Sequence, residues 1–322
     1  MRMLLFYFKK YGGFQYLKNL FFERLFFYAV FLFFILPKNI AGLKQFEEIL
    51  SNKRLLFYKH KFKKLFKTYN FSETVKSRDN KAVKTIWFLW LQGLENAPPV
   101  VRICYNSLLS KLKDYKLILL TSENINKYAV LPDYILEKWH KGFITNTHFS
   151  DILRLELLIT HGGIWLDSTV LLMQDRIPKQ IEDADLFYFQ VLQPGYTSVN
   201  MSSWFMVSKP NNRLLCFTRE CLYTYWRENN KLYNYFLLHY CIMLAAEKYP
   251  EVYENIPKYS SAPPHVLQSE LFEPYNEERF AEISDMCFVQ KLTYKFDYDR
   301  QNIENTFYYN ILHSLCFEKL LN

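Results

Sequence analysis

Three ionisable residues that could do chemistry lie inside the apolar stretch "FSDILRLELLITHGGIWLDSTVLL", residues 149–172. Asp151 and Arg154 are three residues apart, which places them on one face of a helix, and Asp167 follows an apolar run. Burying ionised groups is costly unless they are paired or used. A carboxylate at a strand end can bind a divalent metal ion or the ribose of a nucleotide, and a nearby arginine can bind a phosphate. The alternative is a structural Asp–Arg ion pair, with Asp167 capping a turn.

Two tryptophans add an aromatic surface on which a nucleotide base could stack. Trp87 and Trp90 end the apolar run "IWFLW", and Gly93 behind them leaves room for a close approach. Such stacking tolerates any base, because every base has a π-face. The pair Gly162 and Gly163, which separates a helix from the next strand, is a second candidate for close contact with a nucleotide. We therefore predict that the two tryptophans and the glycine pair belong to a nucleotide site.

The elements that must position these residues alternate between strand and helix. Apolar runs at 83–93 and 115–124 predict two buried strands, and "APP" at 97–99 starts a helix over 100–112. Strand, helix and strand in this order predict a βαβ unit with parallel strands. The same patterns predict helices at 132–142, 212–229 and 234–249, and strands at 184–190 and 203–209.

The helix that carries the Asp–Arg pair is predicted to begin at a capping residue, Asn146 or Thr147, and to end at His161. The next predicted strand, "IWLDSTVLL" at 164–172, contains Asp167. In open α/β sheets, ligands bind beyond the carboxyl ends of the strands, where the strand order reverses. Asp167 is expected to meet a ligand there.

Length and composition fit one large α/β domain with an appendage. The 322 residues are 50% hydrophobic and 19% aromatic, with only 8 glycines, which excludes disordered and collagen-like chains. The six cysteines form no CxxC pair and lie in apolar segments. We therefore expect reduced core cysteines in a cytoplasmic protein.

Positive charge is concentrated in the N-terminal part of the chain. Residues 1–84 contain 18 Lys and Arg against 5 Asp and Glu, whereas the rest contains 22 against 27. The formal net charge of +8 therefore comes from the first part alone. Because a polar stretch at 70–82 separates the two parts, we predict a helical N-terminal segment at 1–80 and the main domain at 81–322.

The N-terminal segment is typical of a chain that lies on an anionic membrane surface. Residues 20–36 are rich in phenylalanine, but the uninterrupted apolar run 25–36 covers twelve residues, where a membrane-spanning helix needs about 20, so we expect it to dip into the interface. Residues 53–67, "KRLLFYKHKFKKLFK", interleave large apolar residues with seven Lys and Arg. The alternatives are a packed structural helix and a nucleic-acid-binding segment, and no nucleic-acid motif supports the second.

The pattern "SDILR…GGIWLDST", with "IWFLWLQG" about sixty residues earlier, resembles the bacterial capsular polysaccharide synthesis family. Its members are glycosyltransferases related to the sugar-binding DxD-containing group and, more distantly, to the clostridial toxin glucosyltransferases. The resemblance runs from about Lys84 to Lys209 and weakens beyond, where 234–240 and 291–295 still retain it. It implies an α/β fold with a GT-A type, Rossmann-like nucleotide-binding core and a mostly parallel sheet at 81–322. The basic N-terminal extension and the C-terminal additions would be helical.

The resemblance also implies roles for individual residues. Trp90 matches the aromatic residue that stacks on the donor base. Asp151 and Arg154 match the pair that contacts the donor sugar and its surroundings, so they are our candidate catalytic residues together with the acid of the strand end. No general base can be singled out among Glu156, Asp175 and Asp185. The histidines are expected to be structural: positions 148, 161, 239, 265 and 313.

The acidic motif departs from the family pattern. Asp167 matches the first acid of DxD and is the expected metal ligand, but the motif reads Asp167-Ser168-Thr169, so a threonine replaces the second carboxylate. Ser168 and Thr169 are still expected at the donor. Positive charge for the donor phosphates would come from Mn²⁺ or Mg²⁺ at Asp167, or from Lys291 or Lys295 in "KLTYK".

The implied function is sugar transfer from a nucleotide-sugar donor, with a UDP-sugar as the leading expectation. The acceptor would be a glycan or lipid-linked glycan of capsule, lipopolysaccharide or lipooligosaccharide. We expect peripheral attachment to the inner face of the cytoplasmic membrane and no nucleic-acid partner. The alternatives are a non-catalytic membrane protein that binds nucleotide sugars or glycans, and an aspartyl-phosphate phosphotransferase. The second normally needs another Asp where Thr169 stands.

Overall fold

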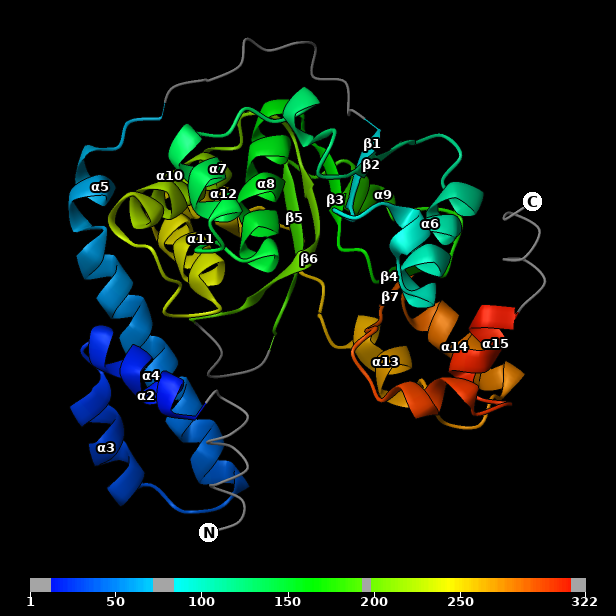
Figure 1. Ribbon diagram of the computed structural model, residues 1–322, viewed down its shortest axis with the longest axis horizontal. Coiled ribbons are helices and arrows are strands. Elements are labelled where there is room, and N and C mark those ends of the chain that lie inside the picture. Colours follow the sequence, from blue (N-terminus) through cyan, green and yellow to red (C-terminus); the bar gives the residue numbers. More distant parts are fainter. Residues whose placement is uncertain (1–12, 72–83, 193–197, 314–322) are drawn as a thin grey trace.

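The computed structural model of the protein describes residues 13–71, 84–192 and 198–313 (Figure 1). The polar stretch 70–82, predicted to separate the two parts, lies almost entirely outside the described residues. The described chain is a mixed α/β structure with a central sheet, helices on both faces of that sheet, and a helical N-terminal extension.

The central sheet contains five strands within the described residues: β1 (Thr85–Leu89), β2 (Lys116–Leu120), β3 (Gly163–Leu166), β5 (Leu186–Gln190) and β6 (Met201–Ser208). Their order is β2-β1-β3-β6-β5. Strand β1 pairs in parallel with β2 and β3, whereas β6 runs antiparallel to both β3 and β5. Four strands therefore point the same way and β6 is reversed, so the predicted mostly parallel sheet is confirmed.

The predicted βαβ unit consists of β1, α6 (Pro99–Lys111) and β2. Pro99 opens α6, where its missing N–H breaks no helical hydrogen bond. Because Leu89 pairs in register with Leu120, the carboxyl ends of β1 and β2 coincide. The residues that follow β1, beginning with Trp90, therefore lie at the same edge of the sheet as those that follow β3.

The strands turn alternate side chains toward two separate cores. Trp87 and Trp165 belong to one core, and Phe88 and Leu166 belong to the other. The second core is covered by α6. Figure 1 shows the helices that cover the first core gathered on the opposite side: α7 (Asp133–His140), α8 (Asn146–His161), α10 (Arg213–Glu228) and α11 (Leu237–Lys248).

The run "IWLDSTVLL" is two strands, where the sequence predicted one. Strand β3 ends before Asp167, and β4 (Val170–Leu172) pairs antiparallel with β7 (Val289–Lys291) in a separate two-stranded sheet. The Asp167 N–H donates to the carbonyl of Trp204 (2.8 Å), and the Asp167 carbonyl accepts from the first N–H of β4 (3.0 Å), which closes a turn. Residues 167–169 therefore lie between the two sheets.

The N-terminal extension is helical, as predicted: α2 (Phe14–Phe22), α3 (Phe26–Ile35), α4 (Ile40–Lys61) and α5 (Lys63–Thr68). Helices α2 and α3 form a hairpin that shares a small core with α4. Glu23 and Arg54, both buried, form an ion pair of 2.8 Å that ties the hairpin to α4. None of the helices in the described chain has both the length and the apolar character to span a bilayer.

The basic stretch 53–67 packs on the main domain. Tyr58 stacks on Tyr240 of α11 with ring centroids 5.4 Å apart, and Phe62 is buried in the same core. The lysines of this stretch lie outward, and Lys61 pairs with Glu228 at 2.8 Å. The packed-helix alternative therefore fits most of this stretch, because all of its large apolar side chains except Leu56, which is 55% exposed, pack on the core beside α10 and α11.

The remaining helices are short. They lie between β4 and β5 or follow α11: α9 (Lys179–Glu182), α12 (Pro250–Glu254), α13 (Val266–Glu270), α14 (Glu277–Met286) and α15 (Phe307–His313). The predicted helical C-terminal additions are thus present. Leu267, Ile283 and Ile311 pack together in a third core that also contains Leu171 of β4. The same core contains Leu292, which directly follows β7 and lies beside the turn at 167–169, called here the acidic turn.

Candidate active site

Asp167 lies at the carboxyl end of β3, where the sequence predicted a ligand. Its Oδ1 accepts hydrogen bonds from Arg154 Nη2 and from Trp165 Nε1, both at 3.0 Å. The Asp167 side chain is 34% exposed, whereas that of Arg154 is 3% exposed. Because both donors use the same oxygen, Asp167 is held in a fixed orientation and keeps an accessible carboxylate edge.

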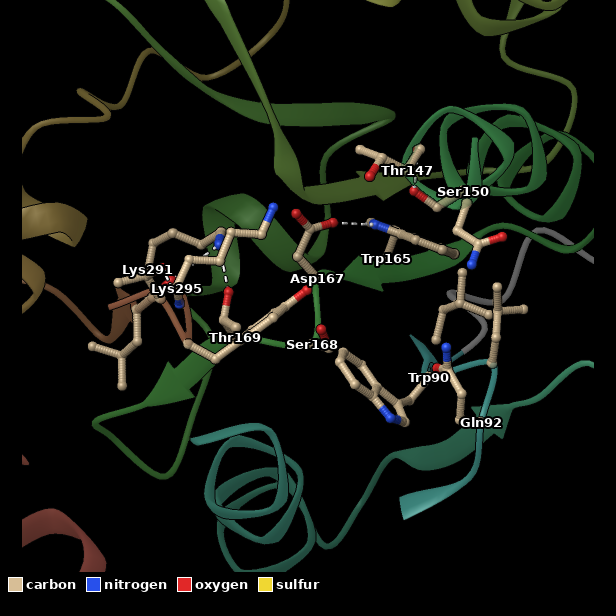
Figure 2. Close-up of a pocket in the computed structure, with 16 residues that line it drawn as sticks. Trp90, Gln92, Thr147, Ser150, Trp165, Asp167, Ser168, Thr169, Lys291 and Lys295 are labelled. Atoms are coloured by element: carbon tan, nitrogen blue, oxygen red, sulfur yellow. Dashed lines mark hydrogen bonds between the residues drawn. The ribbon is translucent and has the colours of Figure 1, made fainter. Parts of the chain in front are cut away.

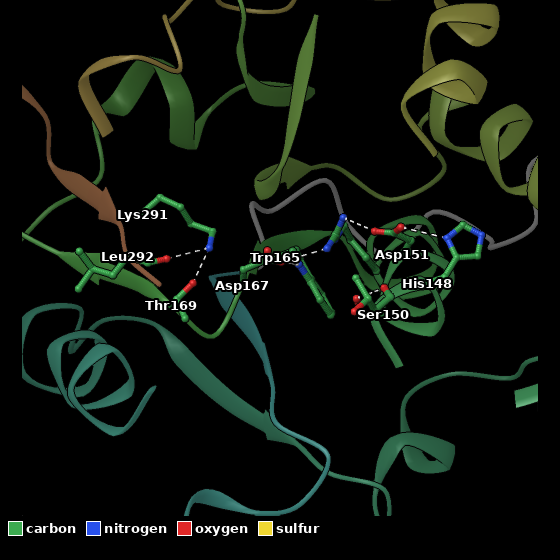
Figure 3. Close-up of polar contacts among 10 residues, drawn as sticks. His148, Ser150, Asp151, Trp165, Asp167, Thr169, Lys291 and Leu292 are labelled. Atoms are coloured by element: carbon green, nitrogen blue, oxygen red, sulfur yellow. Dashed lines mark hydrogen bonds and ion pairs between the residues drawn. The ribbon is translucent and has the colours of Figure 1, made fainter. Parts of the chain in front are cut away.

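Behind Asp167, α8 carries a chain of buried polar groups (Figure 3). Arg154 Nη1 donates to Asp151 Oδ1 at 2.9 Å, and His148 Nδ1 lies 3.2 Å from Asp151 Oδ2. Helix α8 can align all three because they are spaced by three residues, and Thr145, not Asn146 or Thr147, caps its first turn. Burial raises the pKa of Asp151, but Arg154 and His148 more than offset this, so the pKa lies below its usual value.

The predicted Asp–Arg pair is therefore an ion pair that also contacts Asp167, since the arginine joins two carboxylates. The Arg154 guanidinium also lies over the Trp165 ring, 4.9 Å from its centroid. The sequence placed His148 among the structural histidines, but it contacts Asp151 directly. Its position three residues before Asp151 was the signal that could have identified it.

A second histidine, His239 of α11, lies behind the same acids. Burial lowers the pKa of His239 to about 4, with Asp151 opposing the shift and Arg154 adding to it. The Nδ1 atom of His239 is buried and has no hydrogen-bond partner in the described chain. Tyr235, just before α11, has its pKa raised by burial and by the negative charges of Asp151 and Asp167.

Asp167 opens into a cavity of about 360 Å³ (Figure 2). Segments from four parts of the chain line it: the loop after β1, the start of α8, the acidic turn and the segment that begins at the end of β7. The lining residues that the sequence predicted for the donor site are Trp90, Asp167, Ser168, Thr169, Lys291 and Lys295. Asp151 and Arg154 lie behind this surface and act on it through Asp167.

Trp90 lines the cavity with an aromatic ring. Its ring meets that of Tyr294 edge-on, with centroids 5.6 Å apart. The Trp90 Nε1 atom is buried without a hydrogen-bond partner in the described chain. Tyr294 and Gln92 also line the cavity, and the sequence analysis missed both. Both stand beside predicted residues, in "LWLQG" and "KLTYK", which was the only signal for them.

Trp87, Gly162 and Gly163 do not reach this cavity, contrary to the prediction. Trp87 is 2% exposed, and its Nε1 donates to the Gly162 carbonyl at 2.9 Å. The glycines begin β3, so they lie at the end of the strand opposite to Asp167. A side chain at Gly163 would stand 2.5 Å from the Thr85 carbonyl oxygen, so Gly163 serves the close packing of β3 on β1.

Two lysines approach the acidic turn from the C-terminal segment. Lys291 pairs with Val170 across the β4–β7 ladder, which brings its ammonium group into contact with Thr169 Oγ1. The same ammonium donates to the Leu292 carbonyl at 3.2 Å. Lys295 is exposed and lines the cavity four residues further on. In Figure 2 both lysines lie on the same side of Asp167 as Thr169.

The residues of the turn do not fit a divalent metal ion. Mg²⁺ and Mn²⁺ are bound by carboxylate and other oxygen ligands. Here Asp167 offers one carboxylate, already bonded through Oδ1, and the Thr169 hydroxyl is engaged by an ammonium group. Within the described residues no group of three His, Cys, Asp or Glu could hold a metal ion. In the described part of the chain, Asp167 is thus the one carboxylate at the predicted metal position.

The three candidate general bases lie away from the cavity. Glu156 is buried on α8 and accepts hydrogen bonds from Arg219 (3.2 Å) and from the Tyr223 hydroxyl (3.0 Å). Neither Asp175 nor Asp185 lines the cavity. Lys209 pairs with Asp185 instead. Within the three described ranges of the chain, Asp167 is the acid that lines the cavity.

Comparisons with known proteins bear on this geometry. A family model described as "Capsular polysaccharide synthesis protein" matches residues 38–311. The chain is 27% identical to the O-glycosyltransferase PaGT of Phomopsis amygdali over 161 residues, which are 45% of this chain and 38% of that protein. The chain thus spans about two fifths of the length of this curated relative.

One solved structure, the PaToxG glycosyltransferase, has a TM-score of 0.37 and 16% identity to this chain. The match covers 62% of this chain and 80% of the other. At that score the likeness carries no argument about the fold. The match to the family model extends over the whole candidate site, and it is the comparison from which the family of the chain is inferred.

Proposed function

This chain belongs to the capsular polysaccharide synthesis protein family, and from that membership we propose that it transfers a sugar from a nucleoside-diphosphate sugar to a hydroxyl group of a growing surface glycan. A UDP-sugar is the donor we expect, bound in a core of GT-A type. The glycosyltransferase activity in the name of PaGT supports a transferase.

One observation carries the proposal: a single cavity combines an aromatic wall, a carboxylate at a strand end and two ammonium groups. The Trp90 wall suits a planar base, which gains about 1–3 kcal/mol by stacking on an aromatic side chain. Asp167 suits the hydroxyl groups of a ribose or sugar, because a carboxylate accepts hydrogen bonds from them. Lys291 and Lys295 suit the phosphates that lie between base and sugar.

The site residues have defined tasks in such a transfer. The acceptor oxygen forms a bond to the anomeric carbon, the bond from that carbon to the β-phosphate oxygen breaks, and the acceptor proton leaves to a base or to the departing phosphate. Charge develops on the β-phosphate, and cationic groups already in place lower the barrier most. Asp167, fixed by Arg154 and Trp165, orients the donor so that donor and acceptor align.

The test is donor hydrolysis by the full-length protein with a panel of nucleotide sugars and no acceptor. We expect slow release of nucleoside diphosphate from one donor, and none from it with Asp167→Asn. Binding of a donor without hydrolysis or transfer would favour the non-catalytic alternative. If no nucleotide sugar is bound or turned over, the proposed function is wrong.

We also propose that the protein attaches to an anionic membrane through the α2–α3 hairpin. This differs from the sequence-based interpretation, which relied on 53–67 as well. Helix α3, "FFYAVFLFFI", has no charged residue, and Phe27 and Phe34 are each 77% exposed. Several large apolar side chains exposed on one short hairpin mark a candidate contact site. The exposed apolar side chains of the hairpin are Phe14, Phe21, Phe22, Phe27, Val30, Phe31, Phe33, Phe34 and Ile35.

A bilayer is the partner that fits this surface, because basic residues border it. Lys18, Arg24 and Lys38 lie within or next to the hairpin, and its acidic residue, Glu23, is neutralised by Arg54. Aromatic side chains bury in the interface while Lys and Arg contact anionic headgroups. Attachment there suits an enzyme whose acceptor is a lipid-linked glycan.

A further inference from the structure

We propose that Lys291, anchored by Thr169, takes the place of the divalent cation at the donor diphosphate, so that this site binds a nucleoside diphosphate without metal. The inference rests on the proposed function, because it concerns how that donor is held. The inference assigns a positioning role to Thr169, the third residue of Asp167-Ser168-Thr169. In a DxD motif the carboxylate at this position would hold a metal ion, whereas here the threonine hydroxyl holds the ammonium group of Lys291.

The position of Lys291 is set by backbone as well as side-chain contacts. The β4–β7 ladder pairs Lys291 with Val170, and the Leu292 N–H donates to the Thr169 carbonyl at 2.8 Å. The Thr169 side chain is buried, so its hydroxyl is a fixed anchor for the ammonium group. Lys291 can therefore meet a ligand without first being ordered, which lowers the entropic cost of binding.

The charges at the turn argue against a metal ion in the same place. Arg154 already neutralises part of the Asp167 charge, and Lys291 stands beside Thr169. A divalent cation between them would face two positive groups and a single carboxylate. A diphosphate meets the reverse situation, because its oxygens would complete the hydrogen bonds of the ammonium group. Lys295, on the same side of the cavity, adds a second positive charge.

The first experiment measures binding by calorimetry, with UDP, GDP and ADP as probes, in excess chelator and again with Mn²⁺. We expect one of them to bind the wild-type protein equally well in both conditions. Lys291→Met should weaken its binding at least about tenfold, as loss of a charge-assisted hydrogen bond does. Binding of the matching nucleoside, which lacks phosphate, should not change. Lys113→Met, an exposed lysine that does not line the cavity, is the matched control.

The second experiment tests the positioning role of Thr169. Thr169→Val removes the anchoring hydroxyl at nearly constant volume and should weaken diphosphate binding without changing nucleoside binding. The double variant Thr169→Asp/Lys291→Met should acquire Mn²⁺ binding, read directly from the paramagnetic resonance of free Mn²⁺. A purely structural Thr169 would produce neither effect. Melting temperatures verify that each variant is folded.

The outcomes separate the two proposals. If a nucleoside diphosphate binds the wild-type protein only with Mn²⁺, or if Lys291→Met binds it normally, the inference is wrong and the proposed function stands. If no nucleoside diphosphate or nucleotide sugar binds in either condition, the proposed function itself is wrong. Metal-independent binding that requires both Lys291 and Thr169 supports the inference.

Discussion

The Nη2 atom of Arg154 lies 3.0 Å from Oδ1 of Asp167, and this contact joins the middle of α8 to the end of β3. The other terminal nitrogen of the same guanidinium contacts Asp151. One planar, bidentate group therefore sets the distance between a helix and a strand end, a task that lysine cannot perform with a single ammonium.

Arg154→Met should abolish donor turnover and destabilise the protein by about 3–5 kcal/mol, because it leaves a buried carboxylate uncompensated. The matched control is Arg219→Met, which breaks the buried Arg219–Glu156 pair away from the cavity. Chemical denaturation and turnover per folded molecule should show a stability loss for both variants and loss of activity only for Arg154. Equal activity losses in the two variants would contradict a specific role for Arg154.

Asp167→Asn should remove donor turnover and leave the fold intact. The amide still accepts hydrogen bonds from Arg154 and Trp165, but it carries no charge and presents one acceptor oxygen. Turnover and melting temperature are the measurements. Near-wild-type turnover at an unchanged melting temperature would remove Asp167 from the site.

Trp90→Ala should raise the donor KM by about five- to 150-fold, as loss of a stacked base costs about 1–3 kcal/mol. Trp87→Phe is the control, because Trp87 is buried and its Nε1 bonds only to backbone. It should lower stability and leave the KM unchanged. A Trp90 variant that loses stability while its KM does not move would show that Trp90 is a core residue.

Stability should fall as the pH decreases from 6.5 to about 4, the interval between the ordinary pKa of histidine and the lowered pKa of His239. In this interval the unfolded chain holds the proton and the folded protein does not, so acid favours unfolding. The slope is at most about 1.4 kcal/mol per pH unit. His239→Gln should flatten this part of the curve in denaturant titrations. An unchanged slope would show that His239 is protonated in the folded protein.

Replacing Phe27, Phe31 and Phe34 together by Ser should release the protein from phosphatidylglycerol vesicles, because the variant loses the exposed apolar surface of α3. High salt should release only part of the wild-type protein, since screening weakens the charge contribution and not apolar burial. Vesicle sedimentation measures both, and donor hydrolysis in solution should not change. Release of the wild-type protein by salt alone would contradict the apolar contact, and a hairpin that instead pairs two copies would appear as a dimer in solution.

The sequence predicted the helix around Asp151 and Arg154 to within a residue or two, because its apolar spacing and terminal glycines are local signals, although the cap is Thr145 and not Asn146 or Thr147. It could not tell that Trp90 lines the cavity whereas Trp87 is buried in the core. Strand β1 is buried on both faces, so it has no polar side that would reveal where each tryptophan points.

Local sequence signals also could not predict that the strand is interrupted at Asp167. Residues 164–172 have the pattern of one strand, and the turn depends on the carbonyl of Trp204 and on pairing with β7, both distant in sequence. The contact between Thr169 and Lys291 spans 122 residues. Only "KLTYK" and its family resemblance directed attention to that lysine.

The buried Glu23–Arg54 pair bears on how far the cavity can lie from a membrane to which the hairpin binds. With Phe22 also in contact with Tyr233, at 4.8 Å between ring centroids, the hairpin is braced against both α4 and the loop before α11. These contacts fix the orientation of the hairpin relative to the main domain, unlike a flexible linker. If the hairpin inserts into a bilayer, it therefore keeps the cavity at a fixed distance from the membrane surface. The protein would then select acceptors by length, since a lipid-linked glycan would have to extend to that height before its terminal hydroxyl could reach the donor.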